Sequence, residues 1–120
     1  MSTSSWRSPA LPVGPHVPVW APQAARVGLH LPATGEVVPM EAREGDWWVS
    51  PRPLPAGTDY AYRLDDGEDL PDPRSAWQPD GVHGPSRVFD ASRLEWTDDG
   101  WPGRDLLGAV IYELHVGTFT

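Results

Sequence analysis

The chain has 120 residues, among them 15 Pro, 12 Gly and 7 Trp, and 39% of all residues are hydrophobic. This length favours one domain, and the aromatic content argues against disorder, because disordered chains lack the apolar area that offsets ordering entropy. A net charge of −8 disfavours nucleic acids and anionic membranes as partners, and the absence of cysteine excludes disulfides and fits a cytoplasmic location.

The first 15 residues are rich in Ser and Pro, and we expect them to be a flexible N-terminus. They contain no apolar core of a signal peptide, and no apolar run in the chain approaches a membrane span. Between residues 16 and 70 short apolar stretches alternate with turns. This spacing predicts an all-β domain, a small β-sandwich, without a helix or an internal repeat.

Two stretches of this region show the alternation of a half-buried strand. In RVGLHL the apolar residues are Val27, Leu29 and Leu31, and in TDYAYRL they are Tyr60, Tyr62 and Leu64. EVVPME and DWWVS are two further predicted strands, joined by a turn near Glu44-Gly45. A hairpin-type turn is predicted with Asp66-Gly67 at its centre, because both residues tolerate positive φ.

Residues 71–108 are predicted to be an irregular linker. Four prolines between residues 71 and 85 fix φ and remove amide donors, and only SRVFD (86–90) is a candidate short strand. Residues 109–120 begin with the most continuous apolar run, and 109–115 is predicted to be a buried strand. Because such a strand needs neighbours on both edges, we expect the chain to be a piece of a longer protein.

Several motifs occur together and in order: VWAPQAARVGLHL, GDWW, PAGTDYAYRLDDG, DPRSAWQPDGVHGPSRV and AVIYELHVGTFT. Over about residues 19–120 they resemble the maltooligosyltrehalose trehalohydrolases of the α-amylase family of glycoside hydrolases. The WAP and YELHVG strings also occur in glycogen branching enzymes, whereas the DPRS…WQP-x-GVHGPS string is more specific.

The resemblance implies an immunoglobulin-like, early-set β-sandwich at residues 16–70, related to starch-associated modules. The linker would then lead to a (β/α)8 catalytic barrel, truncated here within residues 109–120 after its first strand. These enzymes release trehalose from maltooligosyltrehalose by cleaving the adjacent α-1,4 bond in a retaining, two-carboxylate reaction. The family's Asp nucleophile and Glu acid lie on later strands, so we predict no catalytic residue in this chain.

The chain departs from the family at its first strand, where Val17 and Pro18 stand in place of a longer strand with a Phe. Since proline cannot donate to a β-ladder, we expect this strand to be short or at an edge.

Other polar residues were considered as metal or acid–base sites. Glu113 and His115 share a strand face, but a polar layer near a barrel explains them better than a metal or acid–base pair. The histidines at 16, 30 and 83 lack ligand spacing, so no metal or other cofactor is predicted. The acidic cluster Asp65, Asp66, Glu68 and Asp69 is interpreted as a solvated hairpin tip rather than a calcium site, because the spacing of a calcium loop is absent.

Trp47 and Trp48 are the candidate substrate-binding residues. Adjacent strand residues point to opposite faces, so one ring is expected in the core and the other at solvent, where it could stack on a glucose ring. The alternative is that the second ring packs on the catalytic barrel or caps a sheet edge.

Arg74, Trp77 and Arg87 are the candidate interdomain residues. The arginines could pair with carboxylates across a domain boundary, and Trp77 could bury area at the same boundary. Segment 72–88 is therefore interpreted as a strut between sandwich and barrel rather than a substrate contact.

The leading hypothesis is a non-catalytic N-terminal domain that packs on its own catalytic barrel. The alternatives are an autonomous module that binds α-glucan or maltooligosaccharide, the N-terminal domain of a glycogen branching enzyme, and a purely structural interaction domain. Strand 109–115 without its neighbours also predicts strand-swapped self-association.

Overall fold

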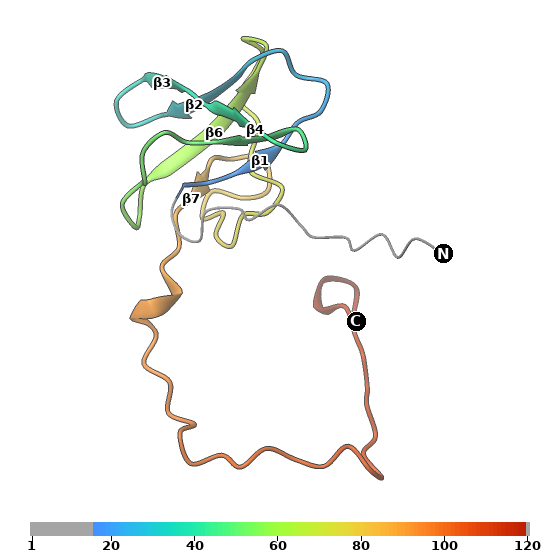
Figure 1. Ribbon diagram of the computed structural model, residues 1–120. Helices are drawn as coiled ribbons and strands as arrows, with labels where there is room; N and C mark the ends of the chain where they lie inside the picture. The colour runs from blue at the N-terminus through green and yellow to red at the C-terminus, as the bar shows by residue number, and fades with distance from the viewer. Residues whose placement is uncertain (1–15, 120) are drawn as a thin grey trace.

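A computed structural model describes residues 16–119, and the expected flexible N-terminus lies outside this range. Two antiparallel sheets face each other (Figure 1). The three-stranded sheet has the order β1-β5-β4, with β1 at Val19–Trp20, β4 at Glu41–Arg43 and β5 at Trp47–Val49. The four-stranded sheet has the order β3-β2-β6-β7, with β2 at Val27–Leu31, β3 at Glu36–Pro39, β6 at Asp59–Leu64 and β7 at Ser86–Arg87.

The core lies between the two sheets, as the alternation in the sequence predicts. On β2 the three apolar residues are buried, and on β6 Tyr60 and Tyr62 are buried beside them. From the other sheet Val19 joins the same cluster, and Trp48 packs against it. The all-β class is confirmed, because residues 16–119 contain no α-helix and only two 3-10 turns, η1 at Ala91–Arg93 and η2 at Val116–Thr118. No helix among these residues is long and apolar enough to cross a bilayer.

The first strand behaves as its proline predicts. Strand β1 begins directly after Pro18, has two residues and occupies an edge of its sheet, paired with β5 only. Because Pro18 has no amide hydrogen, the ladder cannot extend back through it.

Two predictions from the sequence differ from the structure, one in the extent of a strand and one in the position of a turn. The predicted strand EVVPME is divided at Met40, with β3 pairing to β2 in one sheet and β4 pairing to β5 in the other. The turn predicted at Asp66-Gly67 is centred one residue earlier, since Asp65 and Asp66 have φ of 51° and 64° and the amide of Gly67 donates to the carbonyl of Leu64. Aspartate tolerates this left-handed conformation, and the Asp65 carboxylate also accepts hydrogen bonds from the amides of Ala25 and Arg26.

The folded unit extends beyond residue 70. Strand β7 pairs with β6, and Asp72, Ser86 and Val88 are buried against the sandwich. Only after Val88 does the chain leave the sheets, and residues 93–119 run along an extended path (Figure 1). The linker predicted for 71–108 is therefore divided into a packed part and an exposed part.

Residues 109–115 form no strand in this structure. The segment has no ladder partner among the described residues, and its large apolar side chains are exposed, from 46% for Leu114 to 95% for Val110. A buried strand requires neighbours on its edges and faces, and here the segment has none.

Candidate functional site

Segment 70–88 is held against β6 at both of its ends. Leu70 and Tyr62 exchange two backbone hydrogen bonds of 2.8 Å, and the amide of Val88 donates to the carbonyl of Thr58 at 3.0 Å. Within the segment the amide of Arg87 donates to the carbonyl of Trp77 at 2.9 Å. The motif DPRSAWQPDGVHGPSRV is therefore a closed loop on the sandwich.

A buried carboxylate anchors the start of this loop. The Asp72 side chain accepts hydrogen bonds from the Tyr60 hydroxyl at 2.8 Å and from the Arg74 amide at 2.7 Å. The Tyr62 hydroxyl lies 3.2 Å from the same carboxylate and 2.9 Å from the carbonyl of Val17. The amide of Asp72 in turn donates to the Ser86 hydroxyl at 3.0 Å, which ties the two ends of the loop together.

The two tyrosines remain protonated in this environment. Burial, reinforced by the nearby Asp72 carboxylate, raises the pKa of Tyr60 and of Tyr62 well above the usual tyrosine value. Their rings meet edge to face, with centroids 5.8 Å apart. A buried carboxylate is tolerated here because its oxygens are satisfied by donors from β6 and from its own turn.

Arg87 finds its carboxylate partner inside the sandwich rather than across a boundary. Its guanidinium forms a bidentate pair with Asp59 at 2.5 and 2.8 Å and covers the Trp77 ring at 5.1 Å from the centroid. The hydrogen bond from Arg87 lowers the pKa of the Asp59 carboxyl. Trp77 also meets Phe89 edge to face, at 6.4 Å between centroids. Both aromatic rings remain about half exposed, at 43% and 48%.

Arg74 is placed differently from Arg87. Its guanidinium lies 5.5 Å from the centre of the Trp47 ring, and among residues 16–119 it forms no ion pair. It therefore remains available to a carboxylate from outside the described chain.

Trp47 and Trp48 are both half-buried and do not form an open stacking pair. Trp48 faces the core and donates its indole N–H to the carbonyl of Ala21 at 3.3 Å. Trp47 lies on the outer face, opposite Trp20 of β1, with Arg74 over its ring. A sugar stacking on Trp47 would have to share or displace that guanidinium, and the binding role of this pair stays a prediction.

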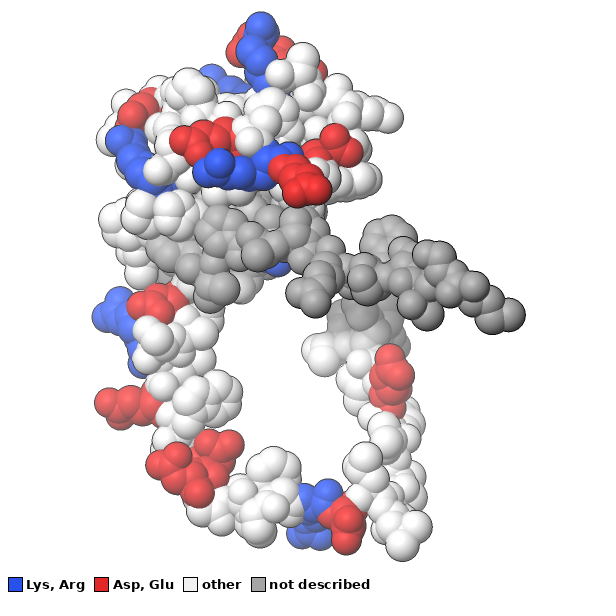
Figure 2. All heavy atoms as spheres, viewed as in Figure 1, with Lys and Arg blue, Asp and Glu red and all other residues white. Residues whose placement is uncertain are grey.

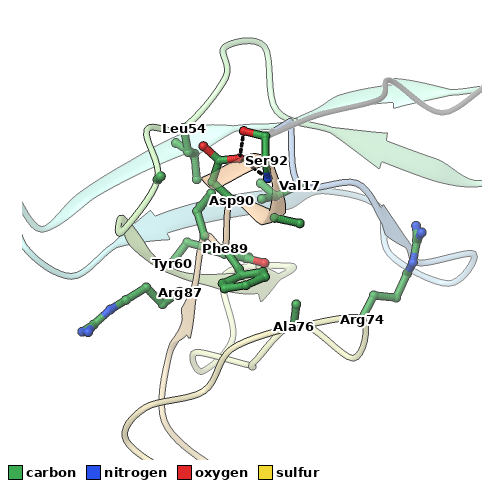
Figure 3. Close-up of a pocket in the computed structure, with 12 residues that line it drawn as sticks. Val17, Leu54, Tyr60, Arg74, Ala76, Arg87, Phe89, Asp90 and Ser92 are labelled. Carbon is green, nitrogen blue, oxygen red and sulfur yellow. Dashed lines mark hydrogen bonds between the residues drawn. The ribbon is translucent and has the colours of Figure 1, made fainter. Parts of the chain in front are cut away.

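A pocket of about 530 Å³ opens where the chain leaves β7 (Figure 3). Its walls come from the start of β6, from the loop before it, from the 74–76 part of the closed loop and from the turn η1. Twelve residues line it: Val17, Leu54, Ala56, Tyr60, Arg74, Ala76, Arg87, Val88, Phe89, Asp90, Ala91 and Ser92. Sequence inspection missed this pocket, because its residues are spread over 75 positions and share no local pattern.

Other polar residues form hydrogen bonds and ion pairs within the sandwich. Asp69 accepts hydrogen bonds from Arg63 at 2.5 Å and lies 2.6 Å from His30, and the Arg63 hydrogen bond lowers the pKa of the Asp69 carboxyl. Asp66 pairs with Arg26. Residues 16–119 hold no cluster of three or more metal-ligating side chains. Most of the acidic cluster thus serves the turn and the adjacent strands.

The charged side chains visible in Figure 2 occur in mixed groups of both signs over the sheets. Along the extended segment they form small groups with uncharged residues between the groups. Neither pattern forms the continuous basic surface that nucleic acids select.

The fold is similar to a β-sandwich that forms part of an α-amylase-type protein. A crystal structure of a candidate alpha amylase from Salmonella typhimurium superposes with a TM-score of 0.70 and 38% identity, covering 86% of this chain and 18% of that one. No family model matches the sequence.

Curated relatives give a more particular result, and they confirm the resemblance carried by the motifs. The chain is 52% identical over 106 residues to malto-oligosyltrehalose trehalohydrolase of Arthrobacter ramosus, and 49% identical over 110 residues to that of Rhizobium sp. (strain M-11). The protein of the same name from Saccharolobus solfataricus is 36% identical over 102 residues. The chain spans about 18% of the length of each of these three relatives.

Proposed function

We propose that this chain is the non-catalytic, N-terminal sandwich of a maltooligosyltrehalose trehalohydrolase. The observation that carries the proposal is identity of 36–52% to proteins of that name along about 85% of this chain but only about 18% of theirs. The catalytic carboxylates would then lie in the remainder of the enzyme, in a (β/α)8 barrel reached through residues 93–119. In this proposal the sandwich is of the immunoglobulin-like, early-set type and the enzyme is cytoplasmic.

The role proposed for the sandwich is to pack against the barrel beside the point where the chain leaves β7. Trp77 and Phe89 supply half-exposed aromatic surface there, and aromatic residues are enriched in interface cores. Arg87 fixes the position of Trp77 through its pair with Asp59, and Arg74 is the arginine left to meet a carboxylate of the barrel. This proposal retains all three interdomain residues but gives Arg87 a positioning role.

The test is a chimaera with the Arthrobacter ramosus relative. Its aligned segment is replaced by this chain, and release of trehalose from maltooligosyltrehalose is measured. Because the sandwich would present the same packing surface, we expect kcat/KM within about ten-fold of the parent enzyme, a barrier change of roughly 1.4 kcal/mol. The isolated 120-residue chain is expected to release no trehalose.

Two controls make the result specific. A chimaera that carries an unrelated β-sandwich of similar length should be inactive or insoluble, because its surface does not fit the barrel. The substitution Arg74→Glu in the active chimaera should lower its stability, since like charges would then meet at the boundary. Trehalose release by the isolated chain, or equal activity with the unrelated sandwich, would contradict the proposal.

A further inference from the structure

The outer face of the three-stranded sheet carries two tryptophans as direct neighbours. Trp20 of β1 and Trp47 of β5 are opposite each other in the ladder. The residues before and after them, Val19 and Trp48, belong to the core, so the rings of Trp20 and Trp47 lie on the outer face. Trp20 is 58% exposed on an edge strand, and its indole N–H has no acceptor among residues 16–119. Trp20 therefore offers an apolar ring and a free donor to a partner.

Arg74 connects these tryptophans to the point where the chain leaves β7. It shares the lining of the pocket there with Phe89, but its guanidinium points out of that pocket in Figure 3. The guanidinium lies instead 5.5 Å from the centre of the Trp47 ring and forms no ion pair within residues 16–119. The boundary that we assign to the barrel at Phe89 and Trp77 is thus continuous, through Arg74, with the outer face of the other sheet.

Two indoles beside an unpaired guanidinium have the chemistry of a protein-binding surface, here named the Trp20–Trp47–Arg74 surface. Trp and Arg are among the residues most enriched where interfaces derive their binding energy, and one buried aromatic side chain contributes roughly 150–250 Å². A planar guanidinium held over an aromatic ring still has its N–H groups free for a bidentate carboxylate. The fitting partner has an apolar depression for Trp20 and an Asp or Glu beside it for Arg74.

A second copy of this chain does not supply that carboxylate. In a two-fold dimer through this face each copy would present the same surface, so two unpaired Arg74 guanidiniums would be buried in one interface. The carboxylate of β4 is not free to compensate them, because Glu41 already pairs with Arg43 beside Trp47. Charge complementarity therefore requires a different surface, one that carries an acidic group.

The remainder of the proposed enzyme can reach this face. Residues 93–119 leave the sandwich along an extended path and can span on the order of 90 Å at full extension. Packed sheets are only about 10 Å apart, so a domain attached to this segment can contact both sheets of the sandwich. A tethered partner is also present at a local concentration on the order of millimolar, so a small surface suffices to hold it.

We propose that the Trp20–Trp47–Arg74 surface is a second contact with the catalytic part of the enzyme. Trp20 inserts into an apolar depression of that part, and Arg74 pairs with a carboxylate at its edge. The inference rests on the proposed function and extends its boundary from the exit of β7 onto the three-stranded sheet. In this arrangement Trp47 supports the Arg74 guanidinium and is not a platform for sugar.

Oxidation of Trp20 by hydroxyl radicals, measured by mass spectrometry of its peptide, tests the contact in the chimaera with the Arthrobacter ramosus relative. Trp20 is exposed in the 120-residue chain and should react readily there, whereas in the chimaera it should react about five-fold more slowly or less. The same proteins unfolded in urea give the reference rate. Met40, which is buried in the core, is the internal control and should be protected in both folded proteins.

Substitution of Trp20 tests whether the contact stabilises the enzyme. Trp20→Ala should speed thermal inactivation of the chimaera by about ten-fold or more, because the apolar depression is left unfilled. The urea midpoint of the isolated chain should change little, since the ring is exposed there. Trp20→Phe keeps an aromatic ring and should give an intermediate rate. Val37→Ala, on the outer face of the other sheet, is the matched control and should alter inactivation by less than about two-fold.

Equal oxidation of Trp20 in the chain and the chimaera, or unchanged inactivation of the Trp20→Ala chimaera, would overturn the proposal. Protection of Trp20 in the isolated chain would overturn it too, in favour of a second copy if protection rises with protein concentration, or of sugar if it requires maltoheptaose. An active chimaera with unprotected Trp20 would reject this contact and leave the proposed function standing. A soluble but inactive chimaera with protected Trp20 would support the contact and count against the proposed function.

Discussion

At the scale of single residues, Asp72 has the largest structural role that the sequence does not display. It is 7% exposed, its carboxylate accepts hydrogen bonds from β6 and from its own turn, and its amide donates to the Ser86 hydroxyl. Removing a buried acceptor leaves its donors unpaired, which costs more than the net value of the hydrogen bonds themselves.

Asp72→Ala is expected to lower the free energy of unfolding by about 2–4 kcal/mol, because the Tyr60 hydroxyl and the Arg74 amide lose their carboxylate partner. Urea unfolding followed by circular dichroism measures this change. Asp98→Ala, at an exposed position in the extended segment, is the control and should stay within about 0.5 kcal/mol of the parent. A loss below 1 kcal/mol for Asp72→Ala would contradict the anchoring role.

The same tyrosines make stability depend on pH at the alkaline end. Burial and Asp72 raise the pKa of Tyr60 and Tyr62 in the folded chain, so their contribution is complete below the unfolded value of about 10 and is lost as pH rises above it. The urea midpoint should therefore fall between about pH 10 and pH 11.5. Tyr60→Phe should flatten this fall, and an equally steep fall in that variant would argue against Tyr60 as a source.

At the scale of elements, the pairing of β2 with β3 depends on a glycine. A Cβ built on Gly28 would lie 2.7 Å from Cγ1 of Val37, on the outer face of the four-stranded sheet. Real side chains do not approach this closely, so a side chain at position 28 would require Val37 to shift.

Gly28→Ala is expected to cost about 1–3 kcal/mol through this contact. Val37→Ala removes the contacting methyl groups from a side chain that is 42% exposed, so alone it should cost less than about 1 kcal/mol. In the double variant the cost should be smaller than the sum of the single costs, by about 0.5 kcal/mol or more. Additive costs would show that the contact is not the cause.

At the scale of the whole molecule, a packed sandwich is joined to an extended segment. The radius of gyration is 18.6 Å, whereas a compact domain of 120 residues has roughly 14 Å. Residues 93–119 contribute to this difference, because they run along an extended path and have no buried side chain. Their exposed apolar residues are the reason to expect self-association or packing on a further domain.

A chain ending at residue 93 should keep its free energy of unfolding within about 0.5 kcal/mol of the parent, since the last core residue is Val88. A chain ending at residue 70 should not fold, because it lacks Asp72, Ser86 and strand β7. Circular dichroism and urea unfolding distinguish the two. A stable chain ending at residue 70 would instead place the whole closed loop outside the folded unit.

Self-association through the extended segment can be tested by measuring the size of the molecule in solution. If residues 109–115 pair between copies, the parent chain should form dimers in light scattering as concentration rises, and Ile111→Asp should shift it towards monomer. Val82→Asp, at a 70% exposed position of the closed loop, is the matched control. A parent chain that stays monomeric at several hundred micromolar would remove the prediction of strand exchange.

The features that could be predicted from the sequence are those carried by a few consecutive residues. The alternation of apolar residues located β2 and β6, Pro18 predicted a short edge strand, and the ordered motifs identified the relatives, because each of these signals lies within a few consecutive residues. The tertiary structure decided that segment 70–88 closes onto β6, that Arg87 pairs with Asp59, and that a pocket forms at the exit of β7. These features join groups 8 to 75 positions apart. Their partners are selected by which buried donors and acceptors the sheets leave unsatisfied.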